Sequence, residues 1–213
     1  MTFLKKYLFS LRENRRFWLL PVLALAWNQS VYYGARILTQ HRKHYELLLE
    51  LDHKIPLVNW MSSVYFLCFL VWGLTYLFMA SREKQTAYRF FLADFLGKFC
   101  ALVIFLIIPT TIVRPEIEGS SVWDFIMRWL YSVDAADNLF PSIHCMVSWY
   151  CFIGVRRIRE CPLWGKIGML LFAIAVCIST VTTKQHVVID IAGGIIIAEI
   201  ADQIAGRIIS RYR

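Results

Sequence analysis

Charged residues are scarce in this sequence of 213 residues, since Asp, Glu, Lys and Arg make up 18% of it and hydrophobic residues 58%. A soluble domain of this size is nearer half apolar and carries more charge. The mean hydropathy is +0.53, and the apolar residues come in long runs, which is typical of membrane-spanning helices. The composition therefore disfavours a soluble globular protein.

Paired cysteines are also lacking, because none of the six cysteines forms a CxxC motif and most lie inside apolar stretches. This pattern disfavours a disulfide framework or a zinc site. No basic stripe alternates with aromatic residues, so the net charge of +8 does not indicate nucleic-acid binding. The Lys and Arg residues lie between apolar runs, where they are interpreted as determinants of membrane topology.

Six apolar stretches are each long enough to cross roughly 30 Å of hydrocarbon at about 1.5 Å per residue. They cover residues 17–38, 57–80, 89–113, 141–158, 163–181 and 186–207. With short connections and no internal repeat, they predict an all-α fold, a six-span transmembrane helical bundle that forms one domain over 17–213. Residues 1–16 place apolar side chains on one helical face, which predicts an amphipathic helix in the membrane interface and no removable signal peptide.

The Lys and Arg residues are distributed unequally between the two sides of these spans. Fifteen fall on the side of the N-terminus, and seven fall on the other side: Arg36, Arg42, Lys43, Lys54, Arg114, Arg128 and Lys184. The positive-inside rule therefore predicts that both termini are cytoplasmic. We expect the protein to be located in the plasma (inner) membrane, with its polar motifs on the outer face of that membrane.

His186 and Asp190 stand four residues apart at the start of the sixth predicted span. On a helix this spacing brings both side chains to one face. Asp190 can then accept a hydrogen bond from one ring nitrogen of His186 and leave the other nitrogen free for nucleophilic attack. The alternative is a histidine at a helix start with an unrelated aspartate.

Pro141 and Ser142 favour a helix start, which puts His144 in the first turn, where exposed N–H groups attract anions. The alternative is an ordinary cap with a surface histidine. Arg114 ends the third predicted span on the same face and offers a planar fork for phosphate oxygens, unless it only reaches the lipid headgroups. Lys184 is either a second phosphate donor or a solvated side chain.

Taken together, these residues resemble the type 2 phosphatidic acid phosphatase superfamily, whose pattern is KxxxxxxRP, PSxH and SRxxxxxHxxxD. Arg114-Pro115 matches the end of the first motif, Pro141-Ser142-Ile143-His144 matches the second, and Ser179, His186 and Asp190 match the third at its spacing. The resemblance runs from roughly residue 57 to 207.

Two positions depart from the family pattern, and both departures remove a cation that would hold phosphate. Ile107 stands at the place of the first-motif lysine, and Thr180 at the place of the third-motif arginine. A hydrogen bond to a charged group contributes about 1.5–3 kcal/mol, so phosphate binding should weaken unless another cation substitutes. We expect Lys184 to be that substitute, with Arg128 a weaker choice.

The resemblance implies a membrane lipid phosphatase that acts on a lipid phosphate or diphosphate through a phosphohistidine, without a metal or other cofactor. His186 would be the nucleophile, Asp190 its orienting partner, and His144 the general acid and base. Arg114, Ser142, Ser179 and Lys184 would hold the phosphoryl oxygens. The expected partners are the lipid substrate and the bilayer.

The sequence is also compatible with two other functions. The stretch Asp137–His144 looks loosely like the first histidine motif of sphingomyelin-synthase-type enzymes, which keeps a lipid phosphotransferase possible. The missing cations also leave room for a catalytically silent scaffold or transporter. Deeper in the predicted spans, Asp94 and Lys98 are expected to pair at i,i+4, joined by Glu199.

Overall fold

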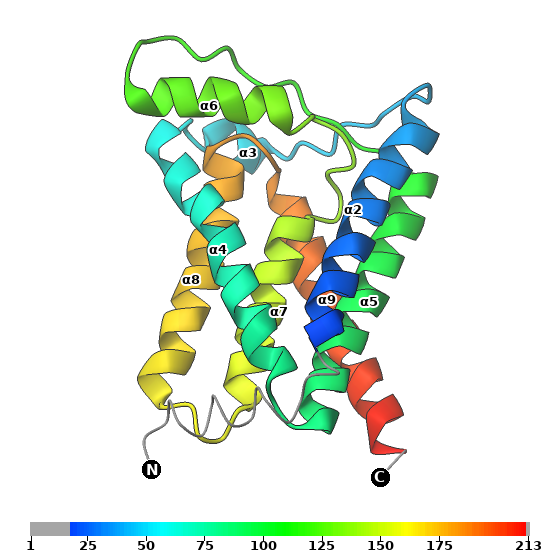
Figure 1. Cartoon of the computed structure of the whole chain (residues 1–213). Coiled ribbons are helices and arrows are strands. Elements are labelled where there is room, and N and C mark those ends of the chain that lie inside the picture. The colour runs from blue at the N-terminus through cyan, green and yellow to red at the C-terminus, as the bar shows by residue number, and fades with distance from the viewer. Residues whose placement is uncertain (1–17, 212–213) are drawn as a thin grey trace.

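The computed structural model describes residues 18–211, and this part of the chain contains eight helices and no β-strand. Six of the helices lie side by side in a bundle (Figure 1). They are α2 (Leu19–Thr39), α4 (Ser62–Ala80), α5 (Lys84–Ile107), α7 (Ile143–Arg157), α8 (Leu163–Thr182) and α9 (Val188–Ser210). The short helix α3 (Glu50–Lys54) and the helix α6 (Val122–Val133) lie at one end of the bundle, which we call the α6 end.

Within residues 18–211, three segments are long and apolar enough to cross a membrane by length and composition: Asn59–Ala80, Lys84–Ile107 and Leu163–Thr182. The first joins a 3-10 turn, Asn59–Met61, to α4, and the other two are α5 and α8. The all-helical class predicted from the sequence is confirmed. The predicted amphipathic helix over 1–16 lies outside the described residues.

The third and sixth spans have different boundaries from those predicted. Helix α5 ends at Ile107 and does not continue to 113, because Pro109 disfavours helical geometry at Ile108 before it. Helix α9 begins at Val188, two residues later than predicted. Both Arg114 and His186 therefore lie in loops beside helix ends, and neither belongs to a helix.

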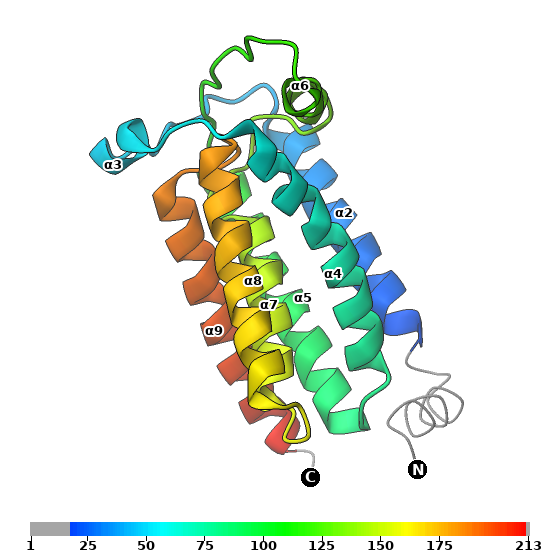
Figure 2. The ribbon, with the colours of Figure 1, turned by 90° about the vertical axis from the view of Figure 1, so that its left-hand side faces the viewer.

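The prediction of short connections is wrong for residues 108–142, which contain α6. Ser121 begins this helix: its hydroxyl accepts the Asp124 N–H at 3.2 Å, while the Asp124 carboxylate accepts the Ser121 N–H at 2.8 Å. At 12 residues α6 is too short to span a membrane. Figure 2 shows α6 end-on above the bundle. The side chains of Phe125 and Trp129 on this helix are exposed.

Helix α9 packs against both α5 and α7, and two glycines allow its close approach to the start of α7. A Cβ at Gly194 would lie 2.6 Å from the Ser142 carbonyl oxygen, and one at Gly193 would lie 2.5 Å from the Phe140 ring. The Ser142 N–H donates to the Asp190 carbonyl oxygen at 3.1 Å. This packing brings the two histidine motifs together.

Buried charges farther from the α6 end are paired with one another. Lys98 and Asp94 form the predicted i,i+4 ion pair at 2.9 Å, and the Tyr76 hydroxyl donates to Asp94 at 2.6 Å. The prediction that Glu199 joins them is wrong, because its side chain faces α7. There it accepts hydrogen bonds from Arg156 at 2.7 Å and from the Trp149 ring nitrogen at 2.8 Å.

Candidate active site

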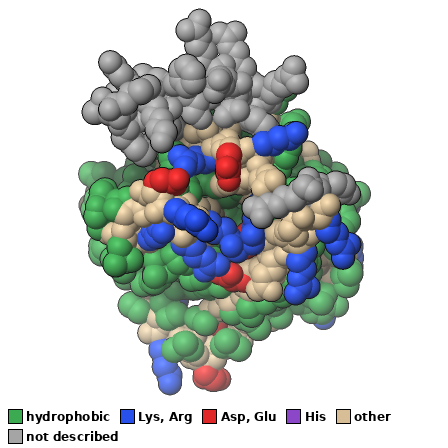
Figure 3. Space-filling model, turned by 90° about the horizontal axis from the view of Figure 1, so that it is seen from below, with side chains coloured by type: hydrophobic (Ala, Val, Ile, Leu, Met, Phe, Trp, Pro, Cys, Tyr) green, Lys and Arg blue, Asp and Glu red, His purple; other side chains and the backbone are tan. Residues whose placement is uncertain are grey.

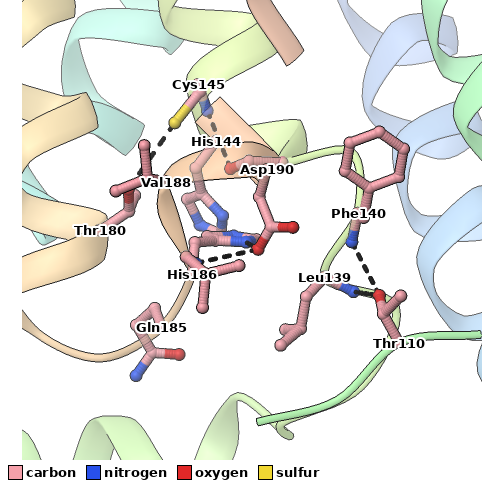
Figure 4. A network of polar contacts seen from close by, with 12 residues as sticks. Thr110, Leu139, Phe140, His144, Cys145, Thr180, Gln185, His186, Val188 and Asp190 are labelled. Atoms are coloured by element: carbon pink, nitrogen blue, oxygen red, sulfur yellow. Dashed lines mark hydrogen bonds and ion pairs between the residues drawn. The ribbon is translucent and has the colours of Figure 1, made fainter. Parts of the chain in front are cut away.

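His186 and Asp190 form a buried hydrogen-bonded pair at the start of α9 (Figure 4). The His186 Nδ1 lies 3.2 Å from Asp190 Oδ2, and the same oxygen accepts the Val187 N–H at 3.0 Å. A carboxylate only accepts hydrogen bonds, so Nδ1 carries the proton and Nε2 keeps its lone pair. His186 contacts Asp190 from the loop and not from the helical face expected, and the hydrogen bond uses Nδ1 and not Nε2.

His144 stands in the first turn of α7, after the N-cap Ser142, whose hydroxyl accepts the Cys145 N–H at 3.2 Å. The ring centres of His144 and His186 are 5.7 Å apart. The His144 ring packs between aromatic rings of α4, with Tyr65 at 4.5 Å and Trp72 at 5.5 Å. The two histidines are therefore close enough to act on one small group.

His144 is also connected with a carboxylate, that of Asp134. The connection runs through the Tyr65 hydroxyl, whereas His186 contacts Asp190 directly. The Tyr65 hydroxyl lies 3.4 Å from His144 Nδ1 and donates to Asp134 Oδ2 at 2.6 Å. The other oxygen of Asp134 accepts the Tyr32 hydroxyl at 2.8 Å. Asp134 thus orients Tyr65, and through it one nitrogen of His144.

Both imidazoles line one cavity of about 220 Å³ at the α6 end of the bundle. Arg114, Asp134, Asp137 and Gln185 also line it, together with apolar and aromatic side chains of α2, α4 and α6. Among the described residues that line the cavity, Arg114 is the only lysine or arginine. Two histidines, one guanidinium and several hydrogen-bonding groups therefore face a space of small-molecule size.

Arg114 is held in place from three sides. Its Nη1 donates to the Asp134 carbonyl oxygen, its Nη2 donates to Gln185 Oε1, and its guanidinium carbon lies 4.9 Å from the centre of the Tyr131 ring. Tyr131 in turn donates its hydroxyl to the Thr183 carbonyl oxygen at 3.0 Å. The arginine is thus fixed at the cavity wall, next to the loop that carries His186.

The other residues predicted to bind phosphate do not line the cavity. Ser142 caps α7 as described, and the buried Ser179 hydroxyl donates to the Val176 carbonyl oxygen at 2.7 Å. The Lys184 ammonium donates to the backbone carbonyl oxygens of Asp52 at 3.2 Å and Ile55 at 2.6 Å. Arg128 donates to two carbonyl oxygens of the loop before α6.

The two positions that depart from the family pattern also lie away from the cavity lining. Ile107 is 64% exposed at the end of α5. Thr180 is fully buried between α7 and α8, where its hydroxyl donates to the Cys177 carbonyl oxygen at 2.8 Å. Its own carbonyl oxygen accepts the N–H groups of Gln185 and His186, at 2.9 and 3.1 Å. Thr180 therefore supports the backbone of the His186 loop.

The charge of the site is shaped by these contacts. Burial disfavours the protonated ring of His186, but the hydrogen bond and the charge of Asp190 outweigh it and raise the pKa of His186. Burial also disfavours ionised Asp134, yet the nearby His144 and the two tyrosine hydroxyls outweigh it and lower the pKa of Asp134. Asp134 is therefore a carboxylate at neutral pH.

Asp134 and Gln185 were not predicted as site residues. Gln185 could have been predicted from the sequence, because it is an uncharged polar residue directly before the predicted nucleophile His186. Asp134 gave no such indication, because it lies ten residues before His144 in the sequence and comes to the cavity wall only through the position of α6.

A family model described as PAP2 superfamily matches residues 36–203, which include Arg114, His144, His186 and Asp190. No curated protein and no solved structure matches the chain.

Proposed function

Because the chain belongs to the PAP2 superfamily, we propose that it is an integral-membrane lipid phosphatase that hydrolyses a lipid phosphate or diphosphate through a phosphohistidine intermediate. Membership in the superfamily supports phosphatase or phosphotransferase activity in general. The observation that carries the more specific proposal is that His186, paired with Asp190, lines the same cavity as His144.

In the first step His186 Nε2 attacks phosphorus, and the bond from phosphorus to the lipid oxygen breaks. Asp190 accepts the Nδ1 proton in a hydrogen bond and stabilises the positive charge that develops on the ring. His144 donates a proton to the departing lipid oxygen, a role that contributes about 10²–10⁴-fold. Arg114 faces the phosphoryl oxygens, where negative charge accumulates.

In the second step His144, now neutral, takes a proton from water, and the resulting hydroxide attacks phosphorus. The phosphorus–nitrogen bond breaks, inorganic phosphate leaves, and His186 returns to its starting form. None of these steps requires a metal. Asp134, acting through Tyr65, keeps His144 oriented while the ring gives and takes the proton.

A lipid substrate is supported by a second, largely apolar groove of about 490 Å³ next to the cavity. It runs between α2 and α4 as far as Lys98, and it shares four lining residues with the cavity: Asn28, Gln29, Phe69 and Trp72. A phosphate in the cavity can therefore continue into a hydrocarbon chain that lies between these helices.

We propose that all six long helices cross the bilayer, with the α6 end on the outer side and both termini in the cytoplasm. Figure 3 shows the opposite end of the bundle, where Lys and Arg side chains gather. This distribution agrees with the positive-inside rule. The exposed aromatic side chains of α6 fit a helix that lies in the headgroup region.

The test is phosphate release by the purified protein in detergent with EDTA, over a panel of lipid phosphates and diphosphates, beside His186→Ala. We expect metal-independent release by the wild type alone. Release by both proteins would contradict the nucleophilic role of His186. No release from any lipid, and no head-group transfer, would leave the silent scaffold as the better account.

A lipid phosphotransferase is the second candidate, and the charge of the cavity favours it. The described lining contains one arginine and two aspartates, of which Asp137 pairs with Arg36 at 3.1 Å. A phosphodiester carries one negative charge and a phosphomonoester up to two. A cavity with one arginine should therefore bind the diester more readily than the monoester. Lipid products in mixed micelles with an added lipid alcohol would distinguish transfer from hydrolysis.

A further inference from the structure

Gln185 is an almost fully buried glutamine, 1% exposed, in the wall of the cavity. It lies in the loop between α8 and α9, and its N–H and that of His186 both donate to the Thr180 carbonyl oxygen. The loop is also attached to α6, because the Tyr131 hydroxyl donates to Thr183. The backbone therefore fixes where the Gln185 side chain begins, directly beside the proposed nucleophile.

The orientation of the Gln185 amide follows from its contact with Arg114. Arginine has only donors, so the amide oxygen must be the atom that faces Arg114 Nη2. The amide nitrogen then points elsewhere, and Nε2 is buried without a hydrogen-bond partner. Arg114 Nε is a second buried donor without a partner. Buried donors are nearly always satisfied in proteins, so two adjacent exceptions indicate a missing acceptor.

We propose that Gln185 Nε2, together with Arg114, donates hydrogen bonds to oxygens of the phosphoryl group that His186 attacks. This inference rests on the proposed function and names the group that fills the place of the missing third-motif cation. Thr180 cannot bind the phosphoryl group in place of the missing cation, because its side chain is buried and its hydroxyl donates to the Cys177 carbonyl oxygen. A glutamine binds the oxygens without adding charge, so Arg114 is the only lysine or arginine of the described cavity lining that supplies positive charge to them.

The decisive variant is Gln185→Glu, which has nearly the same shape. It keeps an oxygen for Arg114 and replaces the Nε2 donor by a second oxygen that repels phosphate. If Gln185 only holds Arg114 in position, the glutamate should serve at least as well. If it binds the phosphoryl group, binding should weaken by about tenfold or more.

The measurement uses the full chain in detergent, with orthovanadate and inorganic phosphate as probes and stabilisation against thermal unfolding as the readout. The matched control is Gln40→Glu, the same change at an exposed position at the same end of the bundle. We expect orthovanadate to stabilise the wild type and Gln40→Glu, and to stabilise Gln185→Glu far less. If Gln185→Glu does not fold, Gln185→Met removes the donor without adding charge and should weaken binding by about two- to tenfold.

Equal orthovanadate binding by the wild type and Gln185→Glu would overturn the inference, as would the absence of any orthovanadate or phosphate binding by the wild type. The proposed function is judged separately, by lipid hydrolysis. Hydrolysis with an unchanged KM in Gln185→Glu would reject this role for Gln185 and leave the phosphatase assignment standing. Orthovanadate binding that depends on Gln185, without hydrolysis of any lipid, would support the anion-binding role of Gln185 and reject the phosphatase assignment.

Discussion

Buried polar groups are treated differently at the two ends of the bundle. Toward the end opposite α6, Asp94, Lys98 and Tyr76 satisfy one another, and Asp202 accepts hydrogen bonds from both Arg89 and Arg157. Among the described residues, seven buried side-chain atoms lack a hydrogen-bond partner. They belong to Asn59, Arg114, Asp137, Asn138, Gln185 and Asp190, all at the α6 end.

The paired polar groups at one end stabilise the fold, whereas the unpaired polar groups at the α6 end are available to bind a ligand. An unpaired buried polar atom costs about 1–3 kcal/mol, so a protein that can satisfy buried charges at one end has no folding reason to leave donors and acceptors unpaired at the other. Four of these six residues line the cavity that both histidines line: Arg114, Asp137, Asn138 and Gln185.

Asp190→Asn should have the largest effect on activity. The amide is not an anionic acceptor for His186 Nδ1. The His186 ring is then no longer held in the tautomer that leaves Nε2 free to attack, and the positive charge that develops on the ring is no longer stabilised. We expect kcat to fall by roughly 10³–10⁴-fold, as in other histidine–aspartate pairs, with little loss of stability. A variant that keeps more than a tenth of wild-type activity would show that Asp190 only caps α9.

Asp94→Ala should have the largest effect on stability. It leaves Lys98 charged and without its partner inside the bundle, which typically costs about 3–5 kcal/mol. The free energy of unfolding can be measured by titration with a denaturing detergent. The double variant Asp94→Leu/Lys98→Met should recover most of the loss. If the single variant instead stays stable and loses activity, the pair belongs to the functional groups.

Asp134→Asn should reduce activity without destroying it. Tyr65 would lose a hydrogen bond to a charged acceptor, and His144 would be oriented less firmly, at a cost of about 1.5–3 kcal/mol in the transition state. We expect kcat to fall about tenfold or more while the thermal unfolding temperature stays near that of the wild type. Tyr65→Phe should have a similar effect, and the two losses should not add. Additive losses would contradict the chain of contacts.

The pH dependence should show the raised pKa of His186. Nucleophilic attack needs the neutral ring, and Asp190 favours the protonated ring. The acid limb of kcat/KM should therefore lie above the ordinary histidine value of 6.5. In Asp190→Asn the limb should move to lower pH, although the maximal rate falls. An identical limb in both proteins would assign the titration to another group.

Lys184→Met should have the smallest effect. The ammonium binds two carbonyl oxygens of the segment that contains α3, so its removal should loosen the loop by about 1 kcal/mol. We expect a modest loss of stability and an unchanged KM for the lipid. A KM increase of tenfold or more would instead support the phosphate-binding role predicted for Lys184.

The helical class and the two histidines that line the cavity follow from local patterns in the sequence, whereas Ser142, Ser179 and Lys184, predicted to bind phosphate, do not line it. Long apolar runs mark the helices, and the spacing of Pro141–His144 and of His186 to Asp190 marks the histidines. The position of Gln185 relative to Arg114 could not be predicted, since it depends on how the 183–187 loop folds back on Thr180. Helix α6 was missed because a search for membrane spans passes over a 12-residue helix. Glu199 was assigned the wrong partner because its distance along the chain does not determine which neighbouring helix it faces.

The most direct test of the account is to trap the covalent intermediate on His186. Brief reaction with a lipid that carries a labelled phosphate, quenched in alkali, preserves a phosphohistidine for mass spectrometry. The account predicts label on the peptide that contains His186 and no label in His186→Ala. Label on another residue, or turnover by His186→Ala at the wild-type rate, would contradict it.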